Sequence, residues 1–286
     1  MKIGATDISA VKIGATDVNK VYLGANLVWE KVSPLLLDLY PNAAAAYSLR
    51  KLRTAYAGAS IKVRRSSDNT EQDIGFVDNE LDTASLLAFV GSGDGFVTTW
   101  YDQSGGGNDA SQTTAANQPQ IVSSGSVILE NGKPSFQFDG SDDWLRMSNL
   151  HNITRLDQFF IASTTDQRYA YPDNFFTSSS KFGFAAHIGN TNATITENYG
   201  SPSLYINSSI FSGTTRGDVY NAQNGYKLIA HINASTTLWT YYSFGQISAA
   251  GYPFNGKLQE LIAYNSDQSS NRTGIETNIN SHYNIY

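Results

Sequence analysis

The sequence has 286 residues and a formal net charge of −6, with no cysteine and only 15% charged residues. This acidic balance argues against a nucleic-acid partner, because nucleic-acid-binding proteins carry a basic face. The absence of cysteine excludes disulfides and thiolate metal sites. No apolar run reaches about twenty residues, so we expect no insertion into a membrane. Abundant glycine and tyrosine with few charges favour turn-rich β structure.

The first thirty residues repeat a ten-residue unit, which reads MKIGATDISA, VKIGATDVNK and VYLGANLVWE. Each unit carries an apolar residue followed by Gly-Ala at the same place. Ten residues suit one short strand and one tight turn, so the repeat predicts a small antiparallel meander with one strand per unit. A sheet of this size cannot bury enough apolar surface to be stable alone.

The repeat therefore needs a partner, either the rest of the chain or another molecule. We predict a docking or oligomerisation module over residues 1–33, a linker over 34–42 and a larger domain over 43–286. A short repeat without disulfides favours symmetric assembly, so we expect a dimer or trimer. The residues expected to mediate assembly are the apolar ones of the repeat, Ile3, Ile13, Leu23, Val28 and Trp29.

Three segments carry sequence signals typical of helices. The first follows Asn42, which can cap the alanine-rich stretch that extends to residue 56. The second is a short helix within residues 80–91 that begins near Asp82 or Thr83. The third closes the chain within residues 268–286, with Ile275 and Ile279 facing inward.

Most of the chain from residue 59 to residue 265 alternates between short strand-like segments and turn residues. Examples are "GFVTTWYDQ", "PSFQFDG", "DQFFIAST" and "KLQELIAYN". Regular spacing of this kind predicts an all-β, two-sheet sandwich with one or two short helices, preceded by the small N-terminal β-repeat module.

Two stretches, at residues 46–76 and 97–112, resemble the N-terminal half of the catalytic domain of α-L-arabinofuranosidase B. The shared pattern runs through "LRKL", Tyr-x-Gly, Val-x-Arg and "YDQSGGGN". A third stretch, "NGKPSFQFDGSDDWLRM" at 131–147, looks like part of a concanavalin A-like (laminin G-like) domain. Together these resemblances imply a jelly-roll sandwich over residues 43–286.

The resemblance to an enzyme family raises the question of catalysis. A retaining glycosidase needs two carboxyl groups about 5 Å apart. The stretch "GQISAAGYPFNG", where the resemblance implies the acid, contains no Asp or Glu, and Glu197 and Asp218 are the only acids from Asn174 to Gln246. Glu260 lies in the closing strand, where a structural role is expected. The arabinofuranosidases are also disulfide-bonded, unlike this chain. We therefore predict that the fold is kept, that catalysis is lost and that the chain is not an enzyme.

The ten-residue repeats resemble the N-termini of bacteriophage tail, collar or head-fibre proteins. The predicted function is thus a virion structural protein, made in the host cytoplasm and displayed on the virion surface. Residues 1–33 would bind other virion proteins, and the exposed sandwich would bind host or mucosal glycans. The alternative is a glycoside hydrolase of arabinofuranosidase type that acts on surface polysaccharide. A bacterial surface adhesin is a third, weaker interpretation.

The candidate glycan site is the string from Trp100 to Asn108. Aromatic rings can stack on sugars while Asp, Gln and Asn bond hydroxyl groups. The alternative is structural, with these polar side chains bonding the backbone of a glycine-rich loop. The ligand-binding candidates are Trp100, Tyr101, Asp102, Gln103 and Asn108, with Tyr169 and Tyr171 from a second loop.

No cofactor is expected. The four histidines show no metal-ligand spacing. Asp139, Asp142 and Asp143 are weak candidates for calcium, which prefers several carboxylate oxygens, although three acids in one turn also occur simply as turn formers.

Overall fold

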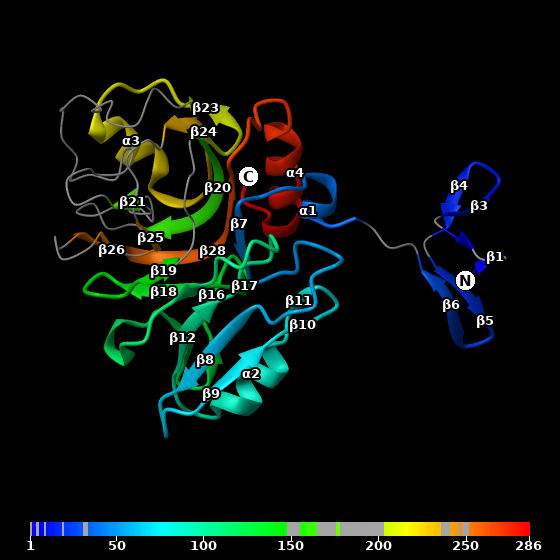
Figure 1. Cartoon of the computed structure of the whole chain (residues 1–286), viewed down its shortest axis with the longest axis horizontal. Coiled ribbons are helices and arrows are strands. Elements are labelled where there is room, and N and C mark those ends of the chain that lie inside the picture. Colours follow the sequence, from blue (N-terminus) through cyan, green and yellow to red (C-terminus); the bar gives the residue numbers. More distant parts are fainter. Residues whose placement is uncertain are drawn as a thin grey trace. The chain divides into compact units, whose positions relative to one another are not determined.

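The computed structural model describes residues 2–3, 6–8, 10–18, 20–30, 34–147, 155–164, 176–177, 203–235, 241–244, 246–247 and 252–286. The chain divides into two compact units, Met1–Leu35 and Leu36–Tyr286 (Figure 1). Among the described residues, no helix has both the length and the apolar character needed to cross a membrane.

The first unit consists of β-hairpins, one for each repeat. Strand pairing shows that each unit folds back on itself around its glycine, so the prediction of one strand per unit is wrong. The physical reason is the turn: Gly14 and Gly24 have φ angles of +62° and +63°, a left-handed conformation that favours glycine. The hairpins are β1 (Lys2–Ile3) with β2 (Thr6–Asp7), β3 (Val11–Ile13) with β4 (Thr16–Val18), and β5 (Lys20–Leu23) with β6 (Asn26–Glu30).

The second unit is an all-β sandwich, which confirms the predicted fold class. Most of its described strands form one continuous antiparallel sheet. In the order given next, each strand is hydrogen-bonded to the strands named before and after it. The order is β21 (Phe176–Thr177), β25 (Tyr241–Phe244), β19 (Leu145–Met147), β13 (Ala110–Ser111), β12 (Gly95–Trp100), β14 (Gln120–Ser123), β18 (Phe136–Asp139), β28 (Asn255–Tyr264), β20 (Arg155–Thr164), β24 (Gly225–Ser235), β22 (Ser203–Ile206) and β23 (Ser209–Ile210).

Further strands branch from this path or form small hairpins. β15 (Ser126–Val127) pairs with β14, β7 (Ala45–Ser48) with β28, and β8 (Ile61–Arg65) with both β12 and β9 (Glu71–Ile74). The small hairpins are β10 (Phe76–Val77) with β11 (Glu80–Leu81), β16 (Leu129–Glu130) with β17 (Lys133–Pro134), and β26 (Gln246–Ile247) with β27 (Tyr252–Pro253).

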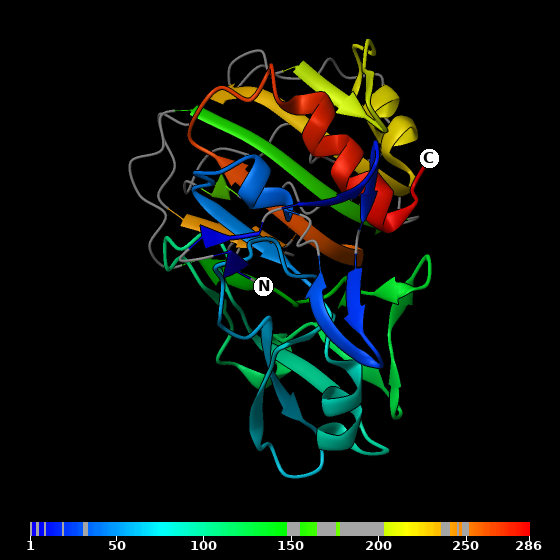
Figure 2. The same cartoon turned by 90° about the vertical axis from the view of Figure 1, so that its right-hand side faces the viewer.

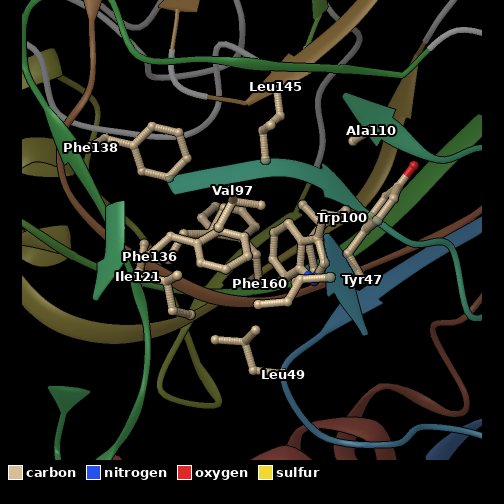
Figure 3. Close-up of a cluster of buried hydrophobic side chains, with 14 of the residues drawn as sticks. Tyr47, Leu49, Val97, Trp100, Ala110, Ile121, Phe136, Phe138, Leu145 and Phe160 are labelled. Carbon is tan, nitrogen blue, oxygen red and sulfur yellow. The ribbon is translucent and has the colours of Figure 1, made fainter. Parts of the chain in front are cut away.

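Strand β20 separates two apolar cores. Phe160 faces the inner core of the sandwich, where it joins Trp100 and Phe136 (Figure 3). Phe159 points to the opposite face of the sheet, as the two-residue period of a strand requires. Helix α4 (Arg272–Tyr283) lies along that second face (Figure 2). Its Ile275 and Ile279 are fully buried there, which confirms the predicted closing helix.

The helix predicted after Asn42 is wrong. The residues Ala45–Ser48 form β7, which pairs with β28, and all four are buried. Alanine favours helices, but long-range pairing and complete burial outweigh that intrinsic preference. The nearest helix, α1 (Leu36–Leu39), precedes this stretch instead.

The second predicted helix is confirmed as α2 (Thr83–Val90). It begins where expected, because the Asp82 carboxylate caps it by accepting a 2.9 Å hydrogen bond from the Ser85 N–H. The remaining helices of the described residues are α3 (Arg216–Gln223) and the short 3-10 helix η1 (Ala115–Asn117).

A buried ion pair ties three of these elements together. Arg50, just after β7, donates to both carboxylate oxygens of Glu260 in β28, at 2.8 and 3.0 Å. Ser48 of β7 and Tyr283 of α4 donate to the same carboxylate, at 2.7 and 3.2 Å. Burial alone would raise the pKa of Glu260, but the Arg50 charge and the hydrogen bonds from Arg50 and Ser48 lower it below its ordinary value. The geometry agrees with the structural role expected for Glu260.

Replacing Arg50 with Met should lower the free energy of unfolding by about 3–5 kcal/mol, because it leaves the Glu260 carboxylate buried without its partner. The double variant Arg50→Met/Glu260→Met should recover most of that loss. Because the folded pKa of Glu260 is lowered, the stabilisation is present above the unfolded pKa and is lost as pH falls through the folded value. Chemical denaturation measures both effects. A loss below about 1 kcal/mol in the single variant would contradict this account.

Candidate functional site

The string from Trp100 to Asn108 begins in the core. The Trp100 side chain is fully buried, and its ring lies 4.7 Å from that of Phe136 and 5.5 Å from that of Tyr47, measured between centroids. Figure 3 shows this ring among the other core side chains. A buried ring has no face open to a sugar, so the structure replaces the expected stacking role of Trp100 with a structural one.

Asp102 organises the loop that follows. One carboxylate oxygen accepts hydrogen bonds from the N–H groups of Ala46 and Ser104, both at 2.9 Å. The other accepts from the Ser104 hydroxyl at 2.7 Å and the Asn108 N–H at 3.0 Å. Asp102 is therefore committed to shaping its own loop and to attaching that loop to β7.

Gln103 and Asn108 make the same kind of link to the chain around β7. The Gln103 amide donates to the carbonyls of Ser48 and Arg50, both at 3.0 Å, and accepts from the Leu52 N–H at 2.8 Å. Asn108 donates to a backbone carbonyl just before β7, at 2.8 Å. These residues match the structural alternative for the string, because their polar atoms bond backbone rather than face solvent.

Tyr101 differs from its neighbours, because it is half-buried and its hydroxyl donates to Asp73 at 2.7 Å. Burial and this carboxylate raise the pKa of Tyr101. The second group of glycan candidates, Tyr169 and Tyr171, lies outside the described residues.

The acidic turn after β18 brings Asp139, Asp142 and Asp143 together, with one oxygen of each within 4.8 Å of the others. Its carboxylates also hold the turn: Asp143 accepts from the Asp139 N–H at 2.9 Å, and Asp139 accepts from the Ser141 N–H at 2.7 Å. Burial, and then the charge of Asp139, raises the pKa of Asp143 to about 7. Calcium binding at this turn stays a prediction.

The described surface contains a polar pocket of about 240 Å³ that adjoins this turn. The two features meet at the start of β28, because Asp139 pairs with Asn255 across the strands. Four strands or hairpins contribute to the pocket, so no local motif could reveal it. The one hint in the sequence is Gln137, a polar residue between two buried phenylalanines. The lining residues are Glu130, Gln137, Ser163, Thr164, Asn255, Gly256 and Lys257.

Two further acids were candidates for catalysis. Glu197 lies outside the described residues. Asp218 is exposed in the first turn of α3, where its carboxylate accepts from the N–H groups of Thr214 and Thr215 at 3.0 and 2.9 Å. The Thr215 hydroxyl in turn accepts from the Asp218 N–H at 3.1 Å, which completes a capping box. These bonds lower the pKa of Asp218, whose role is to start the helix.

Comparison with known proteins connects this scaffold to one kind of enzyme. The sequence model of the family described as "Alpha-L-arabinofuranosidase B, catalytic" matches residues 38–130, about a third of the chain. The match covers β7, β8, β12 and the loop that Asp102 organises. Among curated protein sequences, none matches the chain.

Solved structures extend the likeness to most of the sandwich. An arabinofuranosidase complexed with arabinofuranosyl-α-1,2-xylobiose is 16% identical, with a TM-score of 0.54 over 83% of this chain and 62% of that one. A glutamine mutant of a GH54 α-L-arabinofuranosidase, soaked with 4-nitrophenyl α-L-arabinofuranoside, is 14% identical with the same TM-score and coverage. A GH54 enzyme soaked with a cyclic sulfate inhibitor has a TM-score of 0.51. The chain shares their fold. It spans just under two thirds of the length of each.

These findings correct two predictions. The family match and the shared fold support the alternative, a glycoside hydrolase of arabinofuranosidase type, better than a bacteriophage structural protein. The latter prediction is therefore contradicted, and nothing in the comparisons shows a phage origin. They also contradict the prediction that the chain is not an enzyme. That prediction depended on the lack of a recognisable pair of carboxyl groups, and Glu197, one of the two acids from Asn174 to Gln246, lies outside the described residues. The expected virion partners and virion-surface location stay predictions.

Asp143 should make the stability of the protein depend on pH. Its folded pKa of about 7 exceeds the ordinary value of 3.8, so the folded state holds a proton that the unfolded state has lost between these two pH values. This contribution to stability therefore declines as pH rises from about 4 to 7. Asp143→Asn should remove the decline and be more stable than the wild type at pH 8.

Thermal unfolding at several pH values measures this effect. The matched control is Asp78→Asn, because Asp78 is exposed in a left-handed turn that suits asparagine equally well. The control should keep the wild-type pH slope. Parallel slopes for the Asp143→Asn variant and the wild type would show that the Asp143 proton is not retained in the folded state.

Proposed function

We propose that the chain is a glycoside hydrolase of arabinofuranosidase type that acts on α-L-arabinofuranosyl groups. The observation that carries the proposal is the family match over residues 38–130, continued by a fold shared with arabinofuranosidases over 83% of the chain. The matched segment supplies the buried scaffold, since β7 and the Asp102 loop fix the position of the central strand β28.

Hydrolysis with retention needs two carboxyl groups on opposite sides of the scissile bond. Asp102, Asp218 and Glu260 are committed to structural hydrogen bonds, so they are poor candidates. Glu197 is the one glutamate between Glu130 and Glu260 in the sequence. One of the matched arabinofuranosidase structures is a mutant in which glutamine replaces a glutamate. Glu197 is therefore the first carboxyl group to test as a catalytic residue.

The wild-type chain should release 4-nitrophenol from 4-nitrophenyl α-L-arabinofuranoside. Glu197→Gln should lower kcat by at least about 10²-fold, because loss of an acid, base or nucleophile removes a contribution of that size or larger. Asp218→Asn is the matched control, because it changes the other acid of the same stretch and should retain activity within about threefold. Absence of hydrolysis by the wild-type chain above background would overturn the proposal.

We further infer that residues 1–33 mediate association between copies of this chain. Two of the proposed assembly residues, Ile13 and Leu23, are 76% and 74% exposed, and Val28 is exposed as well. Trp29 has a different role, because it is buried and its ring N–H donates to the Ile8 carbonyl at 2.8 Å within the same unit. The side chain of Ile3 is not among those described.

The double variant Ile13→Ser/Leu23→Ser should shift the protein from a dimer or trimer to a monomer, because it removes exposed apolar surface that association would bury. Light scattering at matched protein concentrations measures the mass. Lys12→Ser is the control, because Lys12 is exposed beside Ile13 in the same strand. A monomeric wild-type chain, or an unchanged mass in the double variant, would contradict the inference.

A further inference from the structure

Three polar side chains form a row across the polar pocket. In the strand register, Lys257 of β28 lies opposite Gln137 of β18 on one side and opposite Ser163 of β20 on the other. Directly opposed residues share one face of a sheet, with Cβ atoms about 5 Å apart. The row therefore places an ammonium, a carboxamide and a hydroxyl group side by side. The Gln137 amide nitrogen donates to the carbonyls of Phe138 and Gly256, at 2.8 and 3.2 Å, so its oxygen is the atom offered to a ligand.

This row faces away from the inner core of the sandwich. Its chain neighbours Phe136, Phe138 and Leu258 are all buried in that core, so the alternation of the strands places the row on the opposite face. On that face, α4 covers the apolar part of the sheet. The row lies where the sheet surface becomes polar, next to the β16–β17 hairpin that supplies Glu130.

Hydrogen bonds hold the walls of the pocket in place without a ligand. The Lys257 ammonium donates to the Glu130 carboxylate at 2.9 Å and to the Leu129 carbonyl at 2.7 Å, so the hairpin is fixed to the sheet. Gln259, at a β-bulge of the same strand, donates to the hairpin carbonyls of Glu130, Lys133 and Pro134 at 3.0–3.1 Å. A pocket whose polar groups are already oriented loses little entropy on binding.

An aromatic side chain lies beside the polar row. Tyr226 of β24 is opposite Ser163 in the register and therefore lies on the same face of the sheet. Its hydroxyl donates to Gln259 at 2.6 Å, and the ring is only partly buried. Burial and the nearby Glu130 charge raise the pKa of Tyr226, so the hydroxyl stays protonated at neutral pH.

We propose that this pocket binds one neutral sugar unit. Glu130 and Lys257 cancel in charge, so the lining offers hydrogen-bond donors and acceptors without the uncompensated charge that an ionic ligand would require. Ring hydroxyl groups both donate and accept, which matches a lining of carboxylate, ammonium, amide and hydroxyl groups. The volume of about 240 Å³ is below the range of about 300–1,000 Å³ typical of pockets for larger ligands, so it suits a single ring.

This inference does not rest on the proposed hydrolase function. Sugar binding at the pocket is tested through Gln137 and Ser163, whereas the proposed hydrolysis is tested through Glu197. The two experiments can therefore fail separately. A chain without hydrolytic activity could still bind sugars at the pocket, and an active enzyme could leave the pocket empty.

The test is an NMR titration of the ¹⁵N-labelled full chain with L-arabinose, D-xylose, D-galactose and D-glucose, each added alone. At least one sugar should cause saturable shifts of the Gln137 side-chain amide and the Lys257 backbone amide, with a Kd of about 1 mM. Ser163→Ala should weaken that binding by about three- to tenfold, because it removes one hydrogen-bonding group. Gln137→Met, which keeps the side-chain length but removes the amide, should weaken it similarly.

The matched control is Ser203→Ala, the same substitution at an exposed position of β22 in the same sheet. It should bind with the wild-type Kd. The proposal is overturned if none of the four sugars shifts these two amides saturably, or if Ser163→Ala and Gln137→Met both bind as the wild type does. The rest of each spectrum reports whether a variant is folded.

Discussion

Strand β28 is the constraint on which the rest of the large unit depends. It pairs with β20 along one edge, and along the other edge with β18 over its first residues and with β7 over its last. Its Glu260 carboxylate is fully buried, and this is tolerable only because Arg50 forms a two-bond ion pair with it. Through this one side chain, the start of the domain, its closing strand and the last helix are held in one arrangement.

The same strand explains why structural and functional features lie close together. Near Glu260, the strand forms the ion pair and contacts α4. At its beginning, Lys257 lines the polar pocket and Asn255 pairs with Asp139 of the acidic turn. The bulge at Gln259 lies between these two regions and turns its side chain to the hairpin carbonyls. A bulge of this kind re-aims side chains that a regular strand would alternate.

The features predicted correctly from the sequence are those with local causes. Helix α2 begins at Asp82 because a carboxylate can cap the N–H three residues on, and α4 is visible from the spacing of Ile275 and Ile279. The stretch Ala45–Ser48 was misjudged because its partner strand lies more than two hundred residues away in the chain. Asp102 was ambiguous for a similar reason, since its backbone partner Ala46 is 56 residues away. The pocket depends on the register of four separate segments, which no pattern in one sequence shows.

The likeness to the arabinofuranosidase B family model is confined to residues 38–130 of the sequence. These residues contain the strands and the loop that build the scaffold, where the Gln103 amide donates to the backbone. The most direct test of the account is the incubation of the full chain with arabinofuranosyl-α-1,2-xylobiose, followed by chromatography of the products. A hydrolase of the proposed type should release arabinose and xylobiose in equal amounts. Recovery of the intact trisaccharide after prolonged incubation, from a chain that spectroscopy shows to be folded, would contradict it.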